Sequence, residues 1–475
     1  MNLRDFLQAD NLPSIEFSGL SEMSTDIEVG DLFVAVGSSS KVRDHILEAE
    51  RSGAVAAIVD QSLQIDLEGL NLPVLKLEEL AISRAALASK FFFEPSADIE
   101  CIGITGTNGK TSVAYWIADL SSRLGKKSGY CGTLGWGNLD DLKPTRLTTP
   151  NAIDIQRRLA WFVKRGFKSV ALEVSSHALD QGRTSAIDFD TGVFTNLSRD
   201  HLDYHSTMEA YAKSKAKLFE EYDLKNAVVC VDGSMGRDLV KAFNHEILTY
   251  GAKGDISWSL QLSPEGRKVT WNTPWGQFES VLPIFCEFSV ANLAAAIGVL
   301  LISGISAEEI FLIIEELRQV PGRMETVNPK STSGPKVIVD FAHTPAALKT
   351  VLESLRVRDK GRVISVVGCG GDRDKGKRSQ MGEIVSELSD LAWFTSDNPR
   401  SEDPVLIVDE MMSGVRSDNI FVCIDREEAI VEAISEAAKE DVVLLFGKGD
   451  ESTQESKGVF LPFNDKEIAK KILRS

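Results

Sequence analysis

Residues 103–112 read GITGTNGKTS and combine the residue types that bind a nucleotide phosphate. Glycines let backbone N–H groups approach a phosphate, Lys110 would contact the terminal phosphates, and Thr111 would offer a hydroxyl to Mg²⁺. The usual loop, G-x-x-x-x-G-K-[ST], has a glycine five places before Gly109, where this sequence has Ile104. A glycine-rich turn without a ligand is the alternative interpretation.

The segments on both sides of this loop favour nucleotide binding. The run ECIGIT (100–105) is typical of a strand, and after the loop apolar residues recur at helical spacing, at Val113, Trp116, Ile117, Leu120 and Leu124. A helix N-terminus directs N–H groups and a positive dipole end toward a phosphate. We therefore expect nucleotide contacts from Gly106, Thr107, Asn108, Gly109, Lys110, Thr111 and Ser112.

Two polar segments, LEVSSHALDQGR (172–183) and TNLSRDHLDYHSTMEAYAKSKAKLF (195–219), each follow an apolar strand. In a parallel sheet both would emerge at the carboxyl ends of strands, beside the phosphate loop. Glu173 is costly to bury unless it is paired or holds a metal, although it could instead be an exposed carboxylate at a strand end. His201 and His205 are candidate ligands, with hydrogen-bonded structural histidines as the alternative.

A helix predicted over residues 207–222 places one lysine on its apolar face. Lys215 shares a stripe with apolar and aromatic residues, whereas Lys213 and Lys217 point to the opposite side. Burial would lower the pKa of Lys215 and leave a neutral amine that is able to react. The alternative is a lysine whose ammonium group extends to water.

Composition limits the class of protein. A chain of 475 residues with a formal net charge of -18 is too long for one core and lacks the basic surface that nucleic acids require. The apolar stretch that begins at Val290 is shorter than a membrane span, so we expect a core helix. The N-terminus has no secretory core and the six cysteines are widely spaced, which together favour a cytoplasmic protein with reduced thiols.

Short β-rich runs alternate with helical patterns along the whole chain, as in DLFVAVG, KSVALEVSS, TGVFTNLS, KVIVDFAHT, RVISVVGCGG and VVLLFGKG. This alternation predicts an α/β fold with largely parallel sheets. Boundaries near EPSADIE (94–100) and PGRME (321–325) predict three domains. They are a smaller N-terminal α/β domain (1–97), a central P-loop mononucleotide-binding domain (98–322) and a C-terminal Rossmann-like domain (323–475).

Three apolar strands of the C-terminal part end in the loops GCGGDRDKGKR (368–378), TSDNPRSEDP (395–404) and FGKGDESTQ (446–454). Their residues would converge at one sheet edge, namely Arg373, Asn398, Arg400, Gly447 and Glu451. Arginines bind carboxylates and a glutamate accepts from an ammonium, so these loops predict an amino-acid pocket. An ordinary surface turn is the alternative for DNPR.

Five of these strings resemble motifs of the Mur ligases, the ATP-dependent enzymes that build the peptide stem of bacterial cell-wall precursors. They are TGTNGKTS, TTP at 148–150, EVSSHALDQGR, TNLSRDHLDYH and GRME, in the same order and over nearly the whole chain. The resemblance implies that ATP phosphorylates a substrate carboxylate and that an amine attacks the acyl phosphate and expels phosphate. It is greatest to the members that add the third residue of the stem, which implies UDP-N-acetylmuramoyl-L-alanyl-D-glutamate and meso-diaminopimelate as substrates.

The resemblance also implies roles for individual residues. Lys110, His201 and a carbamylated Lys215 would be catalytic, and two Mg²⁺ ions would be bound by Thr111, Glu173, His201 and the Lys215 carbamate. Further ATP contacts would come from Asn292, Arg323 and Asp340. The UDP-substrate would contact Ser24, Ser38, Ser39, Ser40, Leu147, Thr148, Thr149, Ser175, Gln181 and Arg183. The incoming amino acid would contact Arg373, Asp397, Asn398, Pro399, Arg400, Gly447 and Glu451, with the arginine of DNPR on the distal carboxylate.

The sequence departs from the family pattern near the N-terminus, where Met23-Ser24-Thr25 replaces Asp-Ser-Arg. Asp450 and Phe341 also stand where relatives often have histidine and tyrosine. The alternatives to the predicted reaction are the same ligase using L-lysine, an enzyme like folylpolyglutamate synthetase, and an ATP-hydrolysing switch or motor. We expect a monomer that neither binds nucleic acid nor inserts into a membrane.

Overall fold

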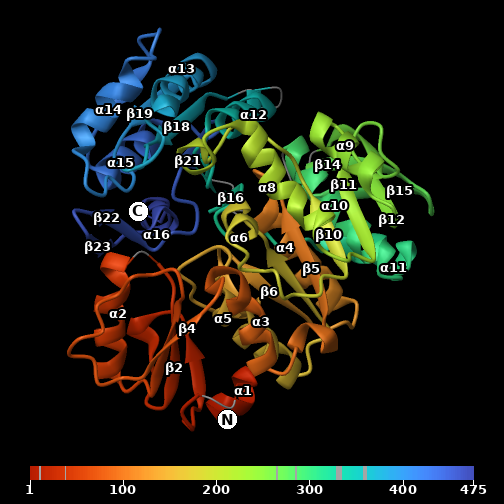
Figure 1. Cartoon of the computed structure of the whole chain (residues 1–475). Helices are drawn as coiled ribbons and strands as arrows, with labels where there is room; N and C mark the ends of the chain where they lie inside the picture. Colours follow the sequence, from red (N-terminus) through yellow and green to blue (C-terminus); the bar gives the residue numbers. More distant parts are fainter. Residues whose placement is uncertain are drawn as a thin grey trace.

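The computed structural model describes residues 1–9, 12–37, 39–263, 266–283, 286–327, 334–356 and 361–474. Helices and strands alternate along the chain, and the strands form three main sheets, each with helices packed against it (Figure 1). The predicted α/β class with largely parallel sheets is confirmed. The strands predicted from the apolar runs are confirmed as well, because each run forms a buried strand.

The N-terminal sheet is parallel, with the order β1-β2-β3-β4. Its strands are β1 (Gly19–Ser21), β2 (Asp31–Ala35), β3 (Ala56–Asp60) and β4 (Val74–Leu77). The helices of this part are α1 (Leu3–Leu7), η1 (Ser24–Asp26), α2 (Ser39–Ser52) and α3 (Leu80–Phe91). Every residue of β2 is buried, because helices cover both faces of the sheet and leave no face for a polar side chain.

The central sheet has the order β12-β11-β10-β5-β9-β6-β7-β8 and is parallel from β12 to β6. The antiparallel strands β7 and β8 extend one edge. The bounds are β5 (Glu100–Thr105), β6 (Ser128–Gly132), β7 (Gly135–Asn138), β8 (Asp141–Lys143), β9 (Ser169–Glu173), β10 (Thr191–Phe194), β11 (Asn226–Cys230) and β12 (Glu246–Tyr250).

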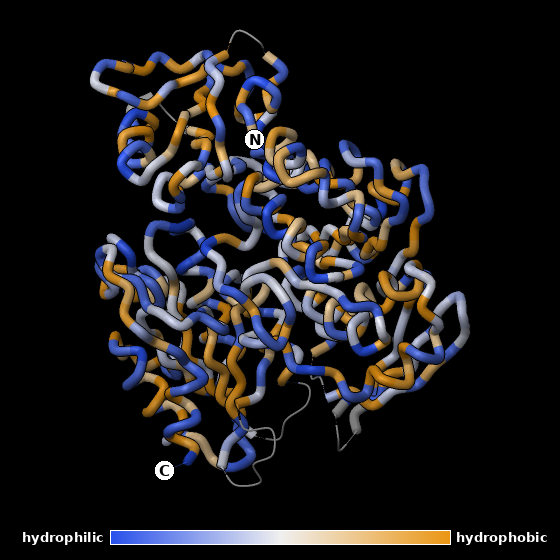
Figure 2. The backbone as a smooth tube through the Cα atoms, turned by 90° about the horizontal axis from the view of Figure 1, so that it is seen from below, coloured by the Kyte–Doolittle hydropathy of each residue, from blue (hydrophilic) through white to orange (hydrophobic). Residues whose placement is uncertain are grey.

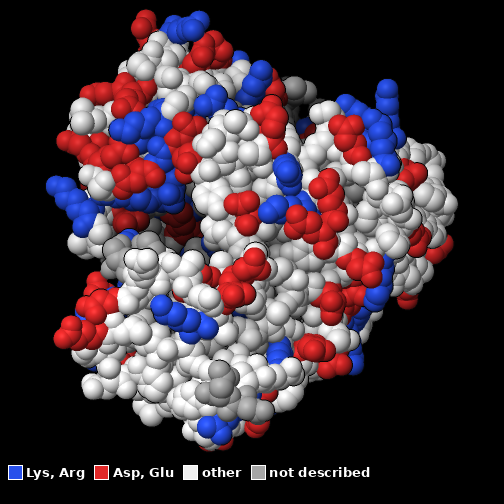
Figure 3. Space-filling model, viewed as in Figure 1, with Lys and Arg blue, Asp and Glu red and all other residues white. Residues whose placement is uncertain are grey.

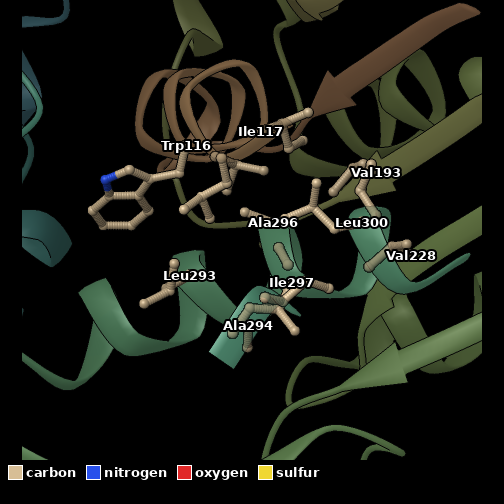
Figure 4. Close-up of a cluster of buried hydrophobic side chains, with 14 of the residues drawn as sticks. Trp116, Ile117, Val193, Val228, Leu293, Ala294, Ala296, Ile297 and Leu300 are labelled. Atoms are coloured by element: carbon tan, nitrogen blue, oxygen red, sulfur yellow. The ribbon is translucent and has the colours of Figure 1, made fainter. Parts of the chain in front are cut away.

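Helices cover both faces of the central sheet. On one face α4 (Lys110–Arg123) and α10 (Glu287–Ile302) share a core in which Trp116, Ile117 and Leu293 are buried (Figure 4). α10 is the core helix predicted from its apolar sequence. The other face packs on α5 (Ala152–Lys164) and α8 (Met208–Glu220). The remaining elements are η2 (Pro95–Asp98), α6 (Ser176–Asp180), α7 (Leu202–His205), α9 (Ser234–Ala242), α11 (Ala307–Ile313) and η3 (Ile314–Glu316).

An antiparallel three-stranded sheet extends this first core. It consists of β13 (Ser257–Ser263), β14 (Gly266–Thr273) and β15 (Gly276–Leu282). Trp271 is buried against α11, and the rings of Phe278 and Phe311 stack with centroids 4.2 Å apart. The sheet therefore belongs to the central part of the molecule and lies away from the phosphate loop.

The C-terminal sheet has the order β16-β17-β21-β18-β19-β20, and all its strands except the antiparallel β16 run parallel. Two apolar clusters lie on its opposite faces, which is the arrangement of a doubly wound, Rossmann-like sheet. Its strands are β16 (Glu325–Thr326), β17 (Lys336–Asp340), β18 (Val363–Val367), β19 (Leu391–Phe394), β20 (Ile420–Val422) and β21 (Val442–Phe446).

The remaining C-terminal elements are mostly helices. They are α12 (Pro345–Arg356), η4 (Lys375–Lys377), α13 (Arg378–Leu388), α14 (Pro404–Met412), α15 (Arg426–Glu436) and α16 (Asp465–Ile472), with the hairpin β22 (Thr453–Ser456) and β23 (Val459–Pro462). The predicted boundary after residue 97 falls within η2, and the boundary after residue 322 falls between η3 and β16. Both domain boundaries stay predictions.

The distribution of polarity follows this layering. Hydrophobic segments run through the C-terminal sheet, whereas connecting segments at the surface are mostly hydrophilic (Figure 2). On the face seen in Figure 3, Lys and Arg side chains lie among Asp and Glu side chains over the C-terminal part. Within the described ranges, no helix combines the length and the apolar character that crossing a membrane requires.

Candidate active site

A cleft of about 720 Å³ is lined by loops from both the central and the C-terminal sheets. The central sheet contributes the loops after β5, β6, β8 and β10 and the last residue of β9, and the C-terminal sheet contributes the loops after β17, β18, β19 and β21. Most of the predicted site residues line it together: Thr107, Asn108, Gly109, Lys110, Thr111, Ser112, Thr148, Glu173, His201, Asn292, Arg323, Asp340, Arg373, Asp397, Asn398, Arg400, Gly447 and Glu451.

The phosphate loop connects β5 directly to α4, as predicted. Gly109 is the N-cap of α4 with φ 89°, and a Cβ atom there would collide with Asn292 Oδ1. The Lys110 Nζ donates to the carbonyl oxygens of Gly106 and Thr107, both at 2.9 Å. Burial lowers the pKa of Lys110. Without a ligand, the ammonium group of Lys110 is therefore bound to carbonyl oxygens of its own loop. Phosphate oxygens could replace these carbonyls as its acceptors.

The missing first glycine has a structural reason. Ile104 lies within β5, is fully buried and is in register with Val193 of β10 and Glu173 of β9. The strand thus continues through the position at which the usual loop already turns. The turn starts only after Thr105, so no glycine is needed at residue 104.

Asn196 fixes the back of the phosphate loop, and sequence reasoning missed it. Its Oδ1 accepts from the Asn108 N–H at 3.0 Å and its Nδ2 donates to the Asn108 carbonyl at 3.1 Å. The Thr107 N–H donates to the Asn196 carbonyl at 2.8 Å, and Thr195 Oγ1 donates to the Asn108 carbonyl at 2.6 Å. An asparagine directly after a strand in TNLS was the available signal.

Glu173 is a buried carboxylate with a full set of donors, not an exposed strand end. Its side chain accepts from Tyr130 Oη at 2.6 Å, from Thr133 N–H at 2.8 Å and from Thr133 Oγ1 at 3.1 Å. Thr111 Oγ1 donates to it at 3.0 Å. The paired carboxylate and the loop threonine, both predicted metal ligands, are therefore in direct contact. Tyr130 and Thr133 were not predicted.

His201 begins α7 in a left-handed conformation, with φ 53°. Burial lowers its pKa to about 4, against the opposing effect of the Asp200 carboxylate, which lies 3.5 Å from Nε2. The imidazole is consequently neutral near pH 7 and has a lone pair for a metal ion. His205 instead contacts Ser176 Oγ through Nε2 at 2.9 Å, as expected for a hydrogen-bonded structural histidine.

Lys215 is buried, with 1% of its surface exposed, so the alternative of an ammonium group extending to water is wrong. Its Nζ donates to the Gly106 carbonyl at 2.8 Å and lies 4.3 Å from the Tyr211 ring centroid. Burial lowers its pKa well below the ordinary value, and the nearby charge of Lys110 lowers it further. Lys215 lies behind the phosphate loop rather than in the lining of the cleft, whereas Lys213 is exposed.

Arg323 connects the C-terminal side of the cleft to the phosphate loop. Its Nη2 donates to Thr111 Oγ1 at 3.2 Å, and its guanidinium lies 4.1 Å from the Phe341 ring centroid. Asp340 accepts from the Met324 N–H at 2.7 Å, which holds the segment that carries Arg323. Burial raises the pKa of Asp340.

The backbone before Arg323 packs directly on the loop that carries Glu451. Gly322 has φ 63°, and a Cβ there would collide with the Asp450 nitrogen. Gly449 has φ 55°, and a Cβ there would lie 2.9 Å from the Gly322 carbonyl oxygen. Both glycines permit a contact between backbones that any side chain would prevent.

The residues predicted to bind the UDP-substrate form a network beside the cleft. Thr149 Oγ1 donates to the Glu173 carbonyl at 2.8 Å and accepts from the Ser175 N–H at 2.9 Å. Arg183 Nε donates to Gln181 Oε1 at 2.9 Å. Among the described members of this group only Thr148 lines the cleft, and Leu147 is exposed beside it.

Of the N-terminal members of that set, the structure describes the side chain of Ser24 alone. The Ser24 side chain is buried and donates to Glu48 Oε2 at 2.6 Å. Ser39 and Ser40 begin α2, and their side chains, like all of Ser38, lie outside the described residues.

The three amino-acid loops are joined to one another. Asn398 Nδ2 donates to Glu451 Oε2 at 2.8 Å, and Arg400 Nη1 donates to the Gly371 carbonyl at 2.7 Å. Arg400 has φ 51° and also pairs with Glu455 at 3.4 Å. Glycine at position 371 leaves room for the Pro399 carbonyl. DNPR is thus part of a structured pocket and not an isolated surface turn.

Comparison with known proteins agrees with this site. Residues 104–300 match the model of the Mur ligase middle domain, and residues 322–449 match that of the Mur ligase, glutamate ligase domain. A UDP-N-acetylmuramoyl-L-alanyl-D-glutamate–2,6-diaminopimelate ligase from Coxiella burnetii is 41% identical over 95% of this chain and 94% of its own. A ligase of the same name from Pseudomonas syringae pv. tomato is 41% identical over 94% of this chain and 93% of its own.

A solved structure of a ligase with that name is also similar. It is 31% identical, covers 100% of this chain and 99% of its own, and superposes with a TM-score of 0.69. One cleft thus brings a strand–loop–helix site suited to phosphate opposite the carboxyl-end loops of a second parallel sheet, and these relatives make the chain an ATP-dependent ligase. The chain belongs to the Mur ligase family. The diaminopimelate ligases that are 41% identical over nearly the whole chain argue against the switch or motor alternative and against the folylpolyglutamate synthetase alternative.

Proposed function

We propose that this ligase joins meso-diaminopimelate to UDP-N-acetylmuramoyl-L-alanyl-D-glutamate with consumption of ATP, in the synthesis of peptidoglycan precursors. One observation carries the proposal: a single cleft is lined by Thr111 and Glu173 of the phosphate site and by Asn398 and Glu451 of the amino-acid pocket. A carboxylate that receives a phosphoryl group and the amine that then attacks it must meet in one water-restricted space.

ATP would bind with its phosphates at the N-terminus of α4. The proposed contacts there are the loop residues Gly106 to Ser112, together with Asn292, Arg323 and Asp340. Lys110 would exchange its bonds to the loop carbonyls for phosphate oxygens, which is electrostatically favourable because it brings a cation to a developing negative charge.

The donor set fits Mg²⁺. Among the described residues no group of three or more His, Cys, Asp or Glu side chains is placed to hold a metal ion by itself. Mg²⁺ is commonly held by one or two carboxylates, with substrate phosphates and waters completing the octahedron. Glu173, Thr111 and neutral His201 would supply the protein donors. When bound, the metal ion neutralises charge on the transferring phosphoryl group.

Lys215 is proposed as the carbamylated residue. A neutral amine adds to carbon dioxide and loses a proton, which would convert a buried lysine into an anion. Its burial and its proximity to Lys110 favour the neutral amine that this reaction needs. The carbamate would be paired with Lys110 or a metal ion, because an isolated buried anion is costly.

The substrate groups would divide between the two sides of the cleft. Thr148, Thr149, Ser175, Gln181 and Arg183 are proposed to hold the UDP-muramyl dipeptide, with the N-terminal serines and Leu147 around the nucleotide. On the other side, Arg373 and Arg400 would bind carboxylates of the amino acid, and Glu451 would accept from an ammonium group. Asp397, Asn398, Pro399 and Gly447 would shape that pocket.

Phosphate release by the purified protein tests the reaction. With ATP and Mg²⁺ alone we expect little turnover, and rapid turnover only when both UDP-N-acetylmuramoyl-L-alanyl-D-glutamate and meso-diaminopimelate are added. Phosphate release that is independent of both substrates would disprove a ligase with this specificity.

L-Lysine tests the amino-acid assignment separately. It lacks the distal carboxylate that Arg400 is proposed to bind, so kcat/KM with L-lysine should be lower by about 100-fold or more. Equal rates with the two amino acids would refute the role given to DNPR. We further propose that the protein is cytoplasmic and monomeric. Size-exclusion chromatography with light scattering would check the monomeric state.

A further inference from the structure

Lys448 lies where two of the amino-acid loops meet, and the residues predicted from sequence do not include it. It follows Gly447 at the end of β21, and its side chain is 0% exposed. Its Nζ donates to Asn398 Oδ1 at 3.2 Å, to Glu451 Oε2 at 2.9 Å and to the Thr453 carbonyl at 2.9 Å. An ammonium group has three N–H donors, so none remains for a ligand.

These bonds determine how Asn398 and Glu451 are oriented. Asn398 Oδ1 accepts from Lys448 and also from the Glu455 N–H at 2.9 Å, which leaves the amide nitrogen to donate to Glu451 Oε2 at 2.8 Å. Glu451 Oε2 therefore receives two donors. Within the described part of the chain, Oε1 has no hydrogen-bond partner, while Glu451 itself lines the cleft and is 38% exposed.

We propose that Lys448 is the positioning residue of the amino-acid pocket, an inference that rests on the proposed function. It holds one carboxylate oxygen of Glu451 against Asn398 and thereby presents the other oxygen to the ammonium group of the incoming amino acid. The positive charge of Lys448 also offsets the negative charge of the Glu451 carboxylate. The pocket can therefore keep this carboxylate oriented before the substrate arrives. Lys448 acts through Glu451 and does not touch the substrate.

A purely structural lysine is the competing explanation, because the bond to Thr453 also ties β22 to the loop after β21. The two roles differ in what they change. A structural role alters the stability of the domain and all kinetic constants together. A positioning role alters the KM for one substrate, because only the amino acid depends on the orientation of Glu451.

The test replaces Lys448 with methionine, an unbranched side chain of similar length without a charge or donors. The variant should fold, since Glu451 is partly exposed and water can solvate its released oxygen. We expect the KM for meso-diaminopimelate to rise by about tenfold or more, with the KM values for ATP and the UDP-substrate within about twofold. Lys457→Met, an exposed lysine on the same hairpin, is the matched control and should leave all three constants unchanged.

A double-mutant cycle with Glu451→Gln identifies the route of the effect. If Lys448 acts through Glu451, adding Lys448→Met to Glu451→Gln should raise the KM for meso-diaminopimelate by less than about threefold beyond the single Glu451 variant. Fully multiplicative effects would show that Lys448 acts by another route and would overturn the proposal.

Other outcomes are equally decisive. An unchanged KM for meso-diaminopimelate in Lys448→Met, or an equal rise in all three KM values, overturns the proposal. Lys448→Gln is a second variant, and if both variants are unfolded the lysine belongs to the fold and the proposal is wrong. Failure of the wild-type protein to use meso-diaminopimelate would instead refute the proposed function, so the two failures are distinguishable.

Discussion

At the scale of single residues, the site contains two neighbouring lysines that differ in how readily they lose a proton. Lys110 and Lys215 both donate to the Gly106 carbonyl, at 2.9 and 2.8 Å. Two ammonium groups so close would repel each other, and the more buried Lys215 is the one that loses its proton more readily. The arrangement therefore assigns the positive charge to Lys110 and leaves Lys215 available for modification.

Lys215→Ala is expected to lower activity by roughly 100-fold or more, because it removes the anion proposed to pair with the metal site. Short carboxylates such as acetate or formate, added to the assay, should restore part of the activity by occupying the space of the carbamate. Lys213→Ala, on the exposed side of the same helix, should retain full activity without rescue. Full activity of Lys215→Ala would show that the lysine is only structural.

At the scale of elements, the junction of the phosphate loop and α4 requires a glycine at residue 109. Gly109 has φ 89°, and Asn292 of α10 occupies the space in which a Cβ atom would lie. Any side chain there must either move Asn292 or unwind the first turn of α4. The loop proposed to bind phosphate is thus held in place by a helix distant in sequence.

Gly109→Ala should raise the KM for ATP by about tenfold or more, since it combines backbone strain of about 1–2 kcal/mol with a clash against a proposed ATP contact. Gly125→Ala is the matched control: its φ is 86°, but no atom lies within 4 Å of the added Cβ. Gly125→Ala should introduce a similar backbone strain and lower thermal stability accordingly, but it should leave the KM for ATP unchanged. Equal KM values for both variants would contradict the assigned role of Gly109.

The strands were predictable because helices cover both faces of the parallel sheets, which makes each strand a short apolar run. The runs at β2, β9, β18 and β21 could be identified for this reason. The sheet of β13, β14 and β15 was not predicted, although SWSLQLS alternates polar and apolar residues, which is the pattern of a strand with one exposed face. The hairpin of β22 and β23 was missed for a different reason: all four residues of its second strand are exposed, so it is not a buried apolar run.

The site was predictable where a residue type is rare in its context, as with Glu173 in an apolar strand and Lys215 on an apolar helix face. Asn196 and Lys448 were missed because asparagine and lysine are ordinary in loops. Their roles depend on a partner loop whose approach sequence does not reveal. Burial of Lys448 results from the packing of β22, which no local pattern predicts.

At the scale of the whole molecule, buried charges connect the N-terminal part to α5 and to the end of α6 in the central part. Glu22 accepts from the Ile153 N–H at 3.1 Å and lies 3.6 Å from Arg84, whose Nη2 donates to the Gln181 carbonyl at 2.9 Å. The network ends on residues proposed to bind the UDP-substrate. Burial raises the pKa of Glu22, and Arg84 only partly opposes this effect.

This raised pKa predicts how stability depends on pH. The folded protein holds the Glu22 proton to a higher pH than the unfolded chain, whose value is near 4.5. The stabilisation is complete below that pH and is lost as the pH rises through the folded pKa, by about 1.4 kcal/mol per pKa unit of elevation. Thermal unfolding of the wild type and Glu22→Gln from pH 4 to 8 should show the wild type losing stability relative to the variant. A constant difference would contradict this prediction.

The backbone contact between Gly322 and Gly449 has a consequence for how the ligands influence each other. Because the two backbones are in contact, we expect the segment of Arg323, beside Thr111, and the loop of Glu451 to move together. Reciprocity then requires that if meso-diaminopimelate tightens nucleotide binding, the nucleotide tightens amino-acid binding by the same factor. Calorimetry of ADP with and without meso-diaminopimelate should give a several-fold difference that Gly449→Ala abolishes. The ligase would sense a complete set of reactants through one piece of main chain, before any bond is made.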